Sequence, residues 1–143
     1  EAIVADEVYA IPSKYELTYM SVSTSLDGHP TATIKLHTND GDILDCGIGI
    51  GSVDSVYKTI DKMVCTDHKL IDYIVKSVTG GTDALGDVTV KLSGKYDQIY
   101  TGRGTSLDIV EASAKAYLNA INKLVYYEQV RGVDGESVEK PIL

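Results

Sequence analysis

The sequence has only two cysteines, and they do not form a metal-binding pair. Cys46 and Cys65 lie outside any Cys-x-x-Cys motif, so a zinc site would need the scattered histidines His29, His37 and His68. Structural zinc ligands come as closely spaced pairs, and therefore no metal site is expected in this chain. We interpret the cysteines as free thiols of a cytoplasmic protein.

Positive charge is also scarce, and long apolar runs are absent from the sequence. Lys and Arg number 13 against 21 Asp and Glu, which gives a formal net charge of −8 and a pI of about 4.7. Nucleic-acid binding needs clustered Lys and Arg to neutralise phosphates, so nucleic acid is not expected as a partner. No apolar run approaches the roughly 18 residues of a membrane span, so no membrane is expected as a partner.

What is present suits one globular domain. The chain has 143 residues, of which 43% are hydrophobic and 24% charged. A chain of this length can bury about 68–70% of its unfolded surface without disulfides or metal. It begins with Glu1 and shows no signal-peptide pattern, so we expect a piece of a longer polypeptide.

Strand and turn signals alternate along the first half. Residues 15–23 and 31–36 alternate in polarity on either side of a turn signal, which predicts a hairpin. A third strand is predicted at 43–46, and a glycine-rich segment then opens a helix that ends near residue 64. The second half repeats this order, with strands near 69–77, 87–92 and 98–101 and a helix from about 108 to 127.

The repeat is visible in the letters as well. Thr-Ile-Lys-Leu at 33–36 matches Thr-Val-Lys-Leu at 89–92, and Ser-Val-Asp at 52–54 matches Ser-Leu-Asp at 106–108. The offset grows from 54 to 61 at the helix ends, so the second helix is predicted to be two turns longer. We therefore expect an α+β fold, a pseudo-twofold repeat of two β-β-β-α units whose antiparallel sheets carry helices on one face.

The second helix has the pattern of a helix packed on a sheet. Asp108 followed by Glu111 predicts an N-terminal capping box. Apolar residues recur at the spacing of one buried helix face: Val110, Ala114, Tyr117, Ile121 and Leu124.

No catalytic constellation is present, so this chain alone is not expected to be an enzyme. His29 precedes a proline in a turn, and His68 lies in a charged segment, which are contexts typical of solvated surface. The glycine-rich segments 47–52 and 102–106 fail as phosphate-binding loops, because Asp54 and Asp108 bring negative charge to the helix starts that follow.

Two long segments, with shorter ones at 30–36 and 47–62, carry a resemblance to a known family. Residues 79–90 read Thr-Gly-Gly-Thr-Asp-Ala-Leu-Gly-Asp-Val-Thr-Val, and residues 100–124 begin Tyr-Thr-Gly-Arg-Gly-Thr-Ser-Leu-Asp. Together they resemble the C-terminal regulatory domain of 2-isopropylmalate synthases over roughly residues 15–125. The related citramalate synthases carry the same type of domain.

The resemblance implies a regulatory role within a larger enzyme. The parent would be an acetyl-CoA-dependent acyltransferase whose catalytic barrel, with its divalent metal, lies outside this chain. The domain itself would need no cofactor. It would form a homodimer and bind leucine near the dimer interface, giving feedback inhibition of the barrel and thus of leucine biosynthesis. In citramalate synthases the effector would be isoleucine.

The resemblance also implies which residues bind the effector. Their types suit a free amino acid, which needs apolar walls, an acceptor for its ammonium group and helix N-terminal amides for its carboxylate. Each also has a structural interpretation, as core packing or helix capping. The implied effector-binding residues are Val53, Asp54, Leu70, Tyr73, Ser77, Ala84, Gly86, Leu107 and Ile109.

The expected organisation has three parts. Residues 1–14 would be the end of a linker, 15–127 the regulatory domain with repeats 15–64 and 68–127, and 128–143 a mobile C-terminal tail. Residues 79–86, with three glycines, are interpreted as a loop between two strands. Three functions stay open: a leucine sensor, an isoleucine sensor, and a purely structural dimerisation module.

Overall fold

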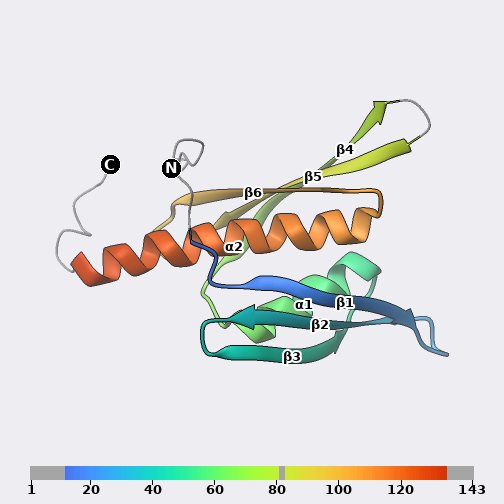
Figure 1. Ribbon diagram of the computed structural model, residues 1–143, viewed down its shortest axis with the longest axis horizontal. Helices are drawn as coiled ribbons and strands as arrows, with labels where there is room; N and C mark the ends of the chain where they lie inside the picture. Colours follow the sequence, from blue (N-terminus) through green and yellow to red (C-terminus); the bar gives the residue numbers. More distant parts are fainter. Residues whose placement is uncertain (1–11, 81–82, 135–143) are drawn as a thin grey trace.

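The computed structural model describes residues 12–80 and 83–134 (Figure 1). The first unit consists of β1 (Glu16–Thr24), β2 (Pro30–Thr38), β3 (Gly41–Ile48) and α1 (Ser52–Val64). The second unit consists of β4 (Lys69–Gly80), β5 (Asp83–Ser93), β6 (Ile99–Ser106) and α2 (Ile109–Asp134). The predicted α+β fold of two β-β-β-α units is confirmed.

Each unit forms its own antiparallel sheet, in the orders β1-β2-β3 and β4-β5-β6. The pairing of β1 with β2 shifts between Leu17 and Tyr19, and the pairing of β4 with β5 shifts between Leu70 and Asp72. Each shift is a β-bulge that leaves one residue of the first strand unpaired. Because the bulges occur at the same place in both units, they align β1 with β4 residue by residue.

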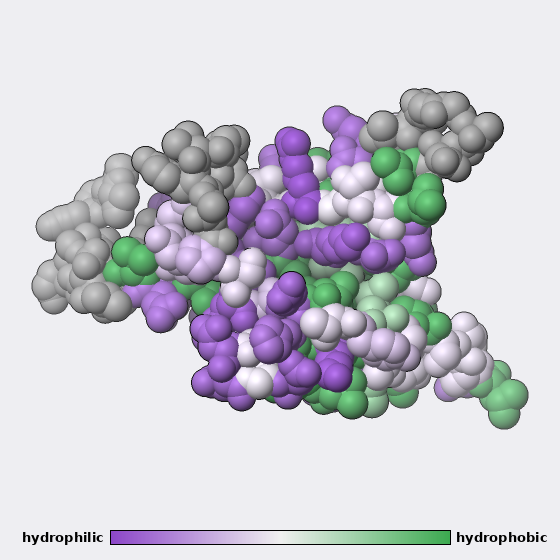
Figure 2. All heavy atoms as spheres, viewed as in Figure 1, coloured by the Kyte–Doolittle hydropathy of each residue, from purple (hydrophilic) through white to green (hydrophobic). Residues whose placement is uncertain are grey.

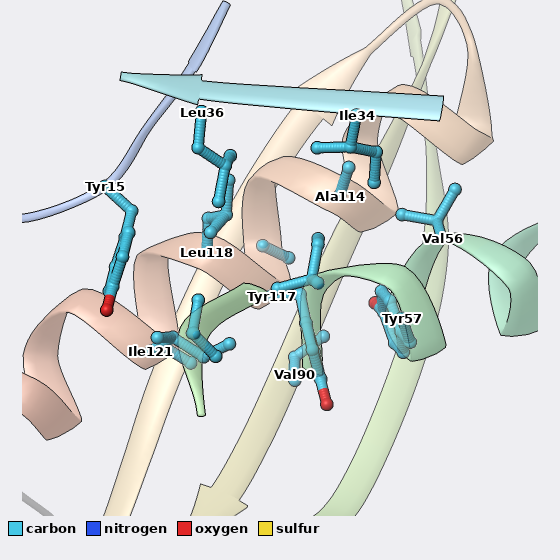
Figure 3. Packing of buried hydrophobic residues seen from close by; sticks show 14 of the residues in the cluster. Tyr15, Ile34, Leu36, Val56, Tyr57, Val90, Ala114, Tyr117, Leu118 and Ile121 are labelled. Carbon is cyan, nitrogen blue, oxygen red and sulfur yellow. The ribbon is translucent and has the colours of Figure 1, made fainter. Parts of the chain in front are cut away.

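The helices lie between the two sheets, so that the molecule has three layers (Figure 1). α1 packs on β2 and β3, while α2 packs on β5 and β6, and the helices touch each other. Figure 3 shows Ile34 and Leu36 pointing from β2 toward Ala114 and Leu118 of α2, with Val90 of β5 beyond the helix. One hydrophobic core therefore joins both units.

Glycines allow each helix to lie directly against its sheet. A Cβ atom on Gly102 would lie 2.1 Å from the carbonyl oxygen of Ala116, and one on Gly104 would lie 2.3 Å from that of Ala112. In the first unit a Cβ on Gly47 would lie 2.7 Å from the hydroxyl of a threonine in α1. The glycines of both units thus serve helix packing.

The expected loop at residues 79–86 is wrong. β4 continues to Gly80 and β5 begins at Asp83, so that Ser77 pairs with Gly86 and Thr79 pairs with Ala84. β-Branched residues at 78 and 79 favour the continued strand. The two predicted effector residues in this segment, Ala84 and Gly86, therefore belong to β5.

α2 is longer than its sequence pattern indicated. It has 26 residues against 13 in α1, and it continues past residue 127 to Asp134. The first part of the expected mobile tail is thus helical, whereas 135–143, like 1–11 of the expected linker, lies outside the described residues. Neither helix in the described part of the chain has the length and apolar character of a membrane span.

The predicted capping box at the start of α2 is only half formed. Asp108 Oδ1 accepts the Val110 N–H at 2.8 Å, as expected of an N-terminal cap. Glu111 Oε1 accepts the Ser106 hydroxyl at 2.9 Å, and this hydroxyl in turn accepts the Asp108 N–H at 3.1 Å. The serine therefore bridges the two acidic residues.

Candidate functional site

Tyr73, a predicted effector residue, is held by contacts with both helices. Its hydroxyl lies 2.7 Å from the Ser113 hydroxyl in α2, and its ring meets Tyr57 of α1 edge-on, with 6.2 Å between centroids. Tyr57 donates from its hydroxyl to the Ser113 carbonyl at 2.9 Å. The three residues therefore join β4, α1 and α2 at one place.

The start of α1 offers amides together with a carboxylate. Gly51 occupies the N-cap position, and no side chain caps the helix. The first-turn N–H groups are therefore open, and although Asp54 opposes a bare phosphate there, it would not oppose a carboxylate whose own ammonium group offsets its charge. Asp54 Oδ2 accepts the Ile50 N–H at 2.8 Å and lies 3.2 Å from Lys58 Nζ. The backbone hydrogen bond from Ile50 and the charge of Lys58 hold the pKa of Asp54 below its usual value, so it is ionised at neutral pH.

Ile109, Gly86 and Ser77 form a second group, at the start of α2. Ser77 pairs with Gly86 across β4 and β5. A Cβ on Gly86 would lie 2.4 Å from Ile109 Cδ1, so Ile109 rests on the glycine. Both Ser77 and Ile109 are exposed, which leaves this group open to solvent.

The structure does not bring all nine predicted residues together. Leu70 pairs with Leu92, seven positions along β4 from Ser77, which is about 23 Å of strand. A single free amino acid cannot span this distance within one chain. Leu107 is 70% exposed at the junction of β6 and α2. The side chain of Ala84 lies outside what the structure describes.

Val53 completes the placement of the predicted residues. It is half-buried against the core and lies one helical turn before Tyr57. Tyr57 and Ser113 were not predicted from the sequence. Tyr57 follows Val53 by four positions and Ser113 follows Ile109 by four, so helical spacing alone could have indicated that each pair shares a face.

Exposed apolar side chains lie around β4 and the starts of both helices. In the described residues neither helix packs its backbone on β4, so the face of β4 toward the helices is largely uncovered. Figure 2 shows apolar residues at the surface at this end, below the β4–β5 hairpin. The exposed apolar residues of this region are Ile50, Leu70, Ile71, Val75, Leu85, Leu107 and Ile109. Such a patch is typical of a contact surface.

His68 is buried, and the prediction that it is solvated surface is wrong. Its side chain is only 5% exposed. Its Nε2 lies 2.9 Å from Asp61 Oδ1 and 3.1 Å from the Tyr117 hydroxyl, and its Nδ1 lies 2.6 Å from the Thr66 hydroxyl. Tyr117 comes from α2, so only the tertiary fold could reveal this contact. His29 lies on the surface, as predicted.

No cluster that could hold a metal ion occurs within residues 12–80 and 83–134. Cys46 and Cys65 are free and exposed.

An α+β module of two β-β-β-α units with an uncovered apolar face has the features of an assembly domain. The family model of the LeuA allosteric (dimerisation) domain matches residues 1–125. The chain therefore belongs to this family, and the predicted resemblance to the regulatory domain of 2-isopropylmalate synthases is confirmed.

Individual relatives agree with the family match. A 2-isopropylmalate synthase of Dictyoglomus turgidum is 50% identical over 125 residues, which cover 87% of this chain and 25% of the relative. One of Carboxydothermus hydrogenoformans is 45% identical over 132 residues, which cover 92% of this chain and 26% of the relative. One of Nostoc sp. is 44% identical over 126 residues, with coverage of 87% and 23%. The chain thus spans about a quarter of these relatives.

Proposed function

We propose that this domain is the leucine sensor of a 2-isopropylmalate synthase. Bound leucine inhibits the catalytic part of the parent enzyme, and the domain acts in the cytoplasm as a homodimer. The proposal rests on the family and on one observation above all: the uncapped amides of α1 lie beside the ionised Asp54. The amides can bind the carboxylate of a free amino acid, and Asp54 can bind its ammonium group.

The remaining residues supply the apolar part of the site. Val53, Tyr73 and Ile109 provide apolar walls. Gly86 has no side chain, so Ile109 can pack directly on its backbone. Ser77 is small and exposed, which leaves space for the side chain of the ligand. Leu70, Leu107 and Ala84 are retained in the proposal as residues that complete the site. Since Leu70 lies too far from Ser77 to share a ligand within one chain, it serves across the dimer interface.

The uncovered face of β4 supports the homodimer. An apolar surface beside the proposed site would be covered by a second copy, and effector binding would then be linked to the geometry of the dimer. The catalytic barrel is the further partner in the parent chain. Its acetyl-CoA-dependent chemistry and its divalent metal belong to residues outside this chain.

A thermal scan with added amino acids tests the effector. A ligand at about 100 times its dissociation constant stabilises the folded state by roughly 2.7 kcal/mol, which raises the melting temperature by several degrees. Leucine should give a larger shift than isoleucine or valine. A larger shift with isoleucine would favour the citramalate synthase type of sensor. If none of the three amino acids raised the melting temperature, the domain would be interpreted as a purely structural dimerisation module.

The variant Asp54→Asn tests the position of the site. Asparagine keeps an oxygen that can accept the Ile50 N–H but removes the charge that would bind the ammonium group. We expect leucine binding to weaken at least tenfold in calorimetry. Asp45→Asn is the matched control, because Asp45 also faces a lysine, Lys62, at 3.5 Å but lies on β3. Equal affinity in the two variants would remove Asp54 from the site.

A further inference from the structure

A groove of about 570 Å³ lies between β1 and α2, and none of the nine proposed effector-binding residues lines it. Residues 15–20 form one wall, and a stripe along α2 and the residue before it forms the other. Leu17 and Met20 are half-buried against the core, and Leu118 is buried, so the groove has an apolar floor. Its volume is within the range of small-molecule sites. The residues of the α2 wall are Asp108, Glu111, Lys115, Leu118, Asn119 and Asn122.

The α2 wall carries both signs of charge. Lys115 Nζ lies 3.2 Å from Glu111 Oε2, and both side chains are nearly half exposed. The hydrogen bond from Ser106 and the nearby Lys115 hold the pKa of Glu111 below its usual value, so Glu111 is ionised. With Asp108, the wall offers two carboxylates for an ammonium group, and Lys115 offers donors for a carboxylate.

The internal repeat relates this groove to the proposed leucine site. The equivalent β-bulges align Leu17 with Leu70 and Met20 with Tyr73.

The strand pairings align the helices differently from the letters: Ala32 pairs with Gly47, and its equivalent Val88 pairs with Gly104. The two helices therefore correspond at an offset of 57, which aligns Asp54 with Glu111. The ion pairs Asp54–Lys58 and Glu111–Lys115 are then equivalent. The groove between β1 and α2 is therefore the pseudo-symmetric counterpart of the site between β4 and α1. The backbone contacts differ, because β1 lies close to both helices, whereas β4 reaches them through side chains such as Tyr73.

We propose that this groove is a second binding site for a free amino acid with an aliphatic side chain. The ammonium group lies against Asp108 and Glu111, the carboxylate meets Lys115, and the aliphatic chain lies on Leu17 and Met20. The choice of ligand class rests on the proposed function, because it follows from the symmetry with the leucine site. Unlike the leucine site, the groove is complete within one chain.

The two methionines of the chain allow a site-specific test. Met20 lines the groove, whereas Met63 lines a separate hollow beside the residues that precede β1. With methionine methyl groups labelled with carbon-13, the NMR spectrum has one signal from each. Leucine should shift the Met20 signal saturably and leave the Met63 signal unchanged. Calorimetry should find two leucines bound per chain.

Variants that remove charge from one site at a time then show which bound leucine occupies which site. In the double variant Asp108→Asn and Glu111→Gln, asparagine still caps α2 and glutamine still accepts from Ser106, so the fold is retained. We expect its Met20 response to weaken at least tenfold while one leucine per chain still binds. Asp54→Asn should have the opposite effect, losing the other leucine and keeping the Met20 response.

The outcomes separate this inference from the proposed function. If the Met20 signal does not move while one leucine per chain binds in an Asp54-dependent way, the groove is not a site and the proposed function stands. If Met20 responds and Asp54→Asn changes no binding, the groove stands and the proposed leucine site is wrong. A protein that binds no leucine overturns both.

Discussion

Tyr57 and Tyr117 stack on each other between the two helices, with 3.8 Å between ring centroids and 11° between ring planes. Their hydroxyls reach in opposite directions. Tyr57 in α1 donates to the Ser113 carbonyl of α2, and Tyr117 in α2 donates to Asp61 of α1 at 2.6 Å. Each helix thus contributes one tyrosine whose hydroxyl donates to the other helix, and the two hydrogen bonds fix the register of α1 along α2.

This crossed pair predicts how substitutions affect stability. Tyr57→Phe removes one hydrogen bond but keeps the stack, so it should lower the free energy of unfolding by about 1 kcal/mol. Tyr117→Phe also keeps the stack but loses the contacts of its hydroxyl with both Asp61 and His68, so it should lower this free energy by about 1–2 kcal/mol. Tyr117→Ala leaves a cavity and should lower it by about 3–5 kcal/mol. Urea unfolding measures these values. If the alanine and phenylalanine variants lost equal stability, the stacked ring would contribute nothing to the helix contact.

The same tyrosines predict unfolding at alkaline pH. Burial raises the pKa of both above the ordinary value of 10.0, and for Tyr117 the hydrogen bond to Asp61 adds to this. In the unfolded chain they ionise near pH 10, whereas in the folded chain they keep their protons. The folded state therefore binds more protons above about pH 10, and stability is full below that pH and falls above it.

Each buried tyrosine should contribute about 1.4 kcal/mol per pH unit to this fall. The variant Tyr117→Phe should therefore lose stability less steeply than the unsubstituted protein between pH 10 and pH 11, as measured by urea unfolding at each pH. Tyr19→Phe is the control, because Tyr19 is exposed on β1. An unchanged slope in Tyr117→Phe would show that another group controls alkaline unfolding.

The close packing of α2 on β6 predicts that Gly104 cannot be replaced. In Gly104→Ala the new Cβ would lie 2.3 Å from the Ala112 carbonyl oxygen and 2.7 Å from the Ala116 N, and backbone atoms cannot move aside easily. We expect a loss of about 3 kcal/mol or more in urea unfolding. At Gly51 a Cβ would meet no atom within 4 Å, so Gly51→Ala should cost less than about 1 kcal/mol. Equal losses would contradict this account.

The order of elements could be predicted because its signals are local. Alternating polarity, turn residues and the matched segments at 33–36 and 89–92 all lie within a few positions of the elements that they indicate. The burial of His68 could not be predicted, because it depends on Tyr117, 49 positions away. The role of Gly104 could not be predicted either, because the residues that it meets, Ala112 and Ala116, are near in sequence but contact it only through the packing of α2 on β6.

The candidate site was only partly predictable. The resemblance selected Tyr73 and Ile109, but their common neighbour Ser113 is brought to Tyr73 only by the tertiary fold, in which the tyrosine side chain reaches α2. The distance of Leu70 from Ser77 depends on strand length, and the segment that the sequence indicated as a loop proved to be strand. Residue types therefore indicated the chemistry of the site, whereas its geometry required the fold.

The uncovered face of β4 predicts where the homodimer forms. Val75 on this face is 46% exposed, and Val75→Asp would place a charge in the proposed interface. We expect sedimentation at tens of micromolar to give a monomer for this variant and a dimer for the unsubstituted protein, because an unpaired buried charge strongly opposes association. Leu44→Asp is the matched control, since Leu44 is also exposed, at 65%, but lies on β3 of the other sheet. A dimer that survives Val75→Asp and is lost in Leu44→Asp would move the interface to the first sheet, and with it would remove the reason for placing Leu70 across a dimer from Ser77.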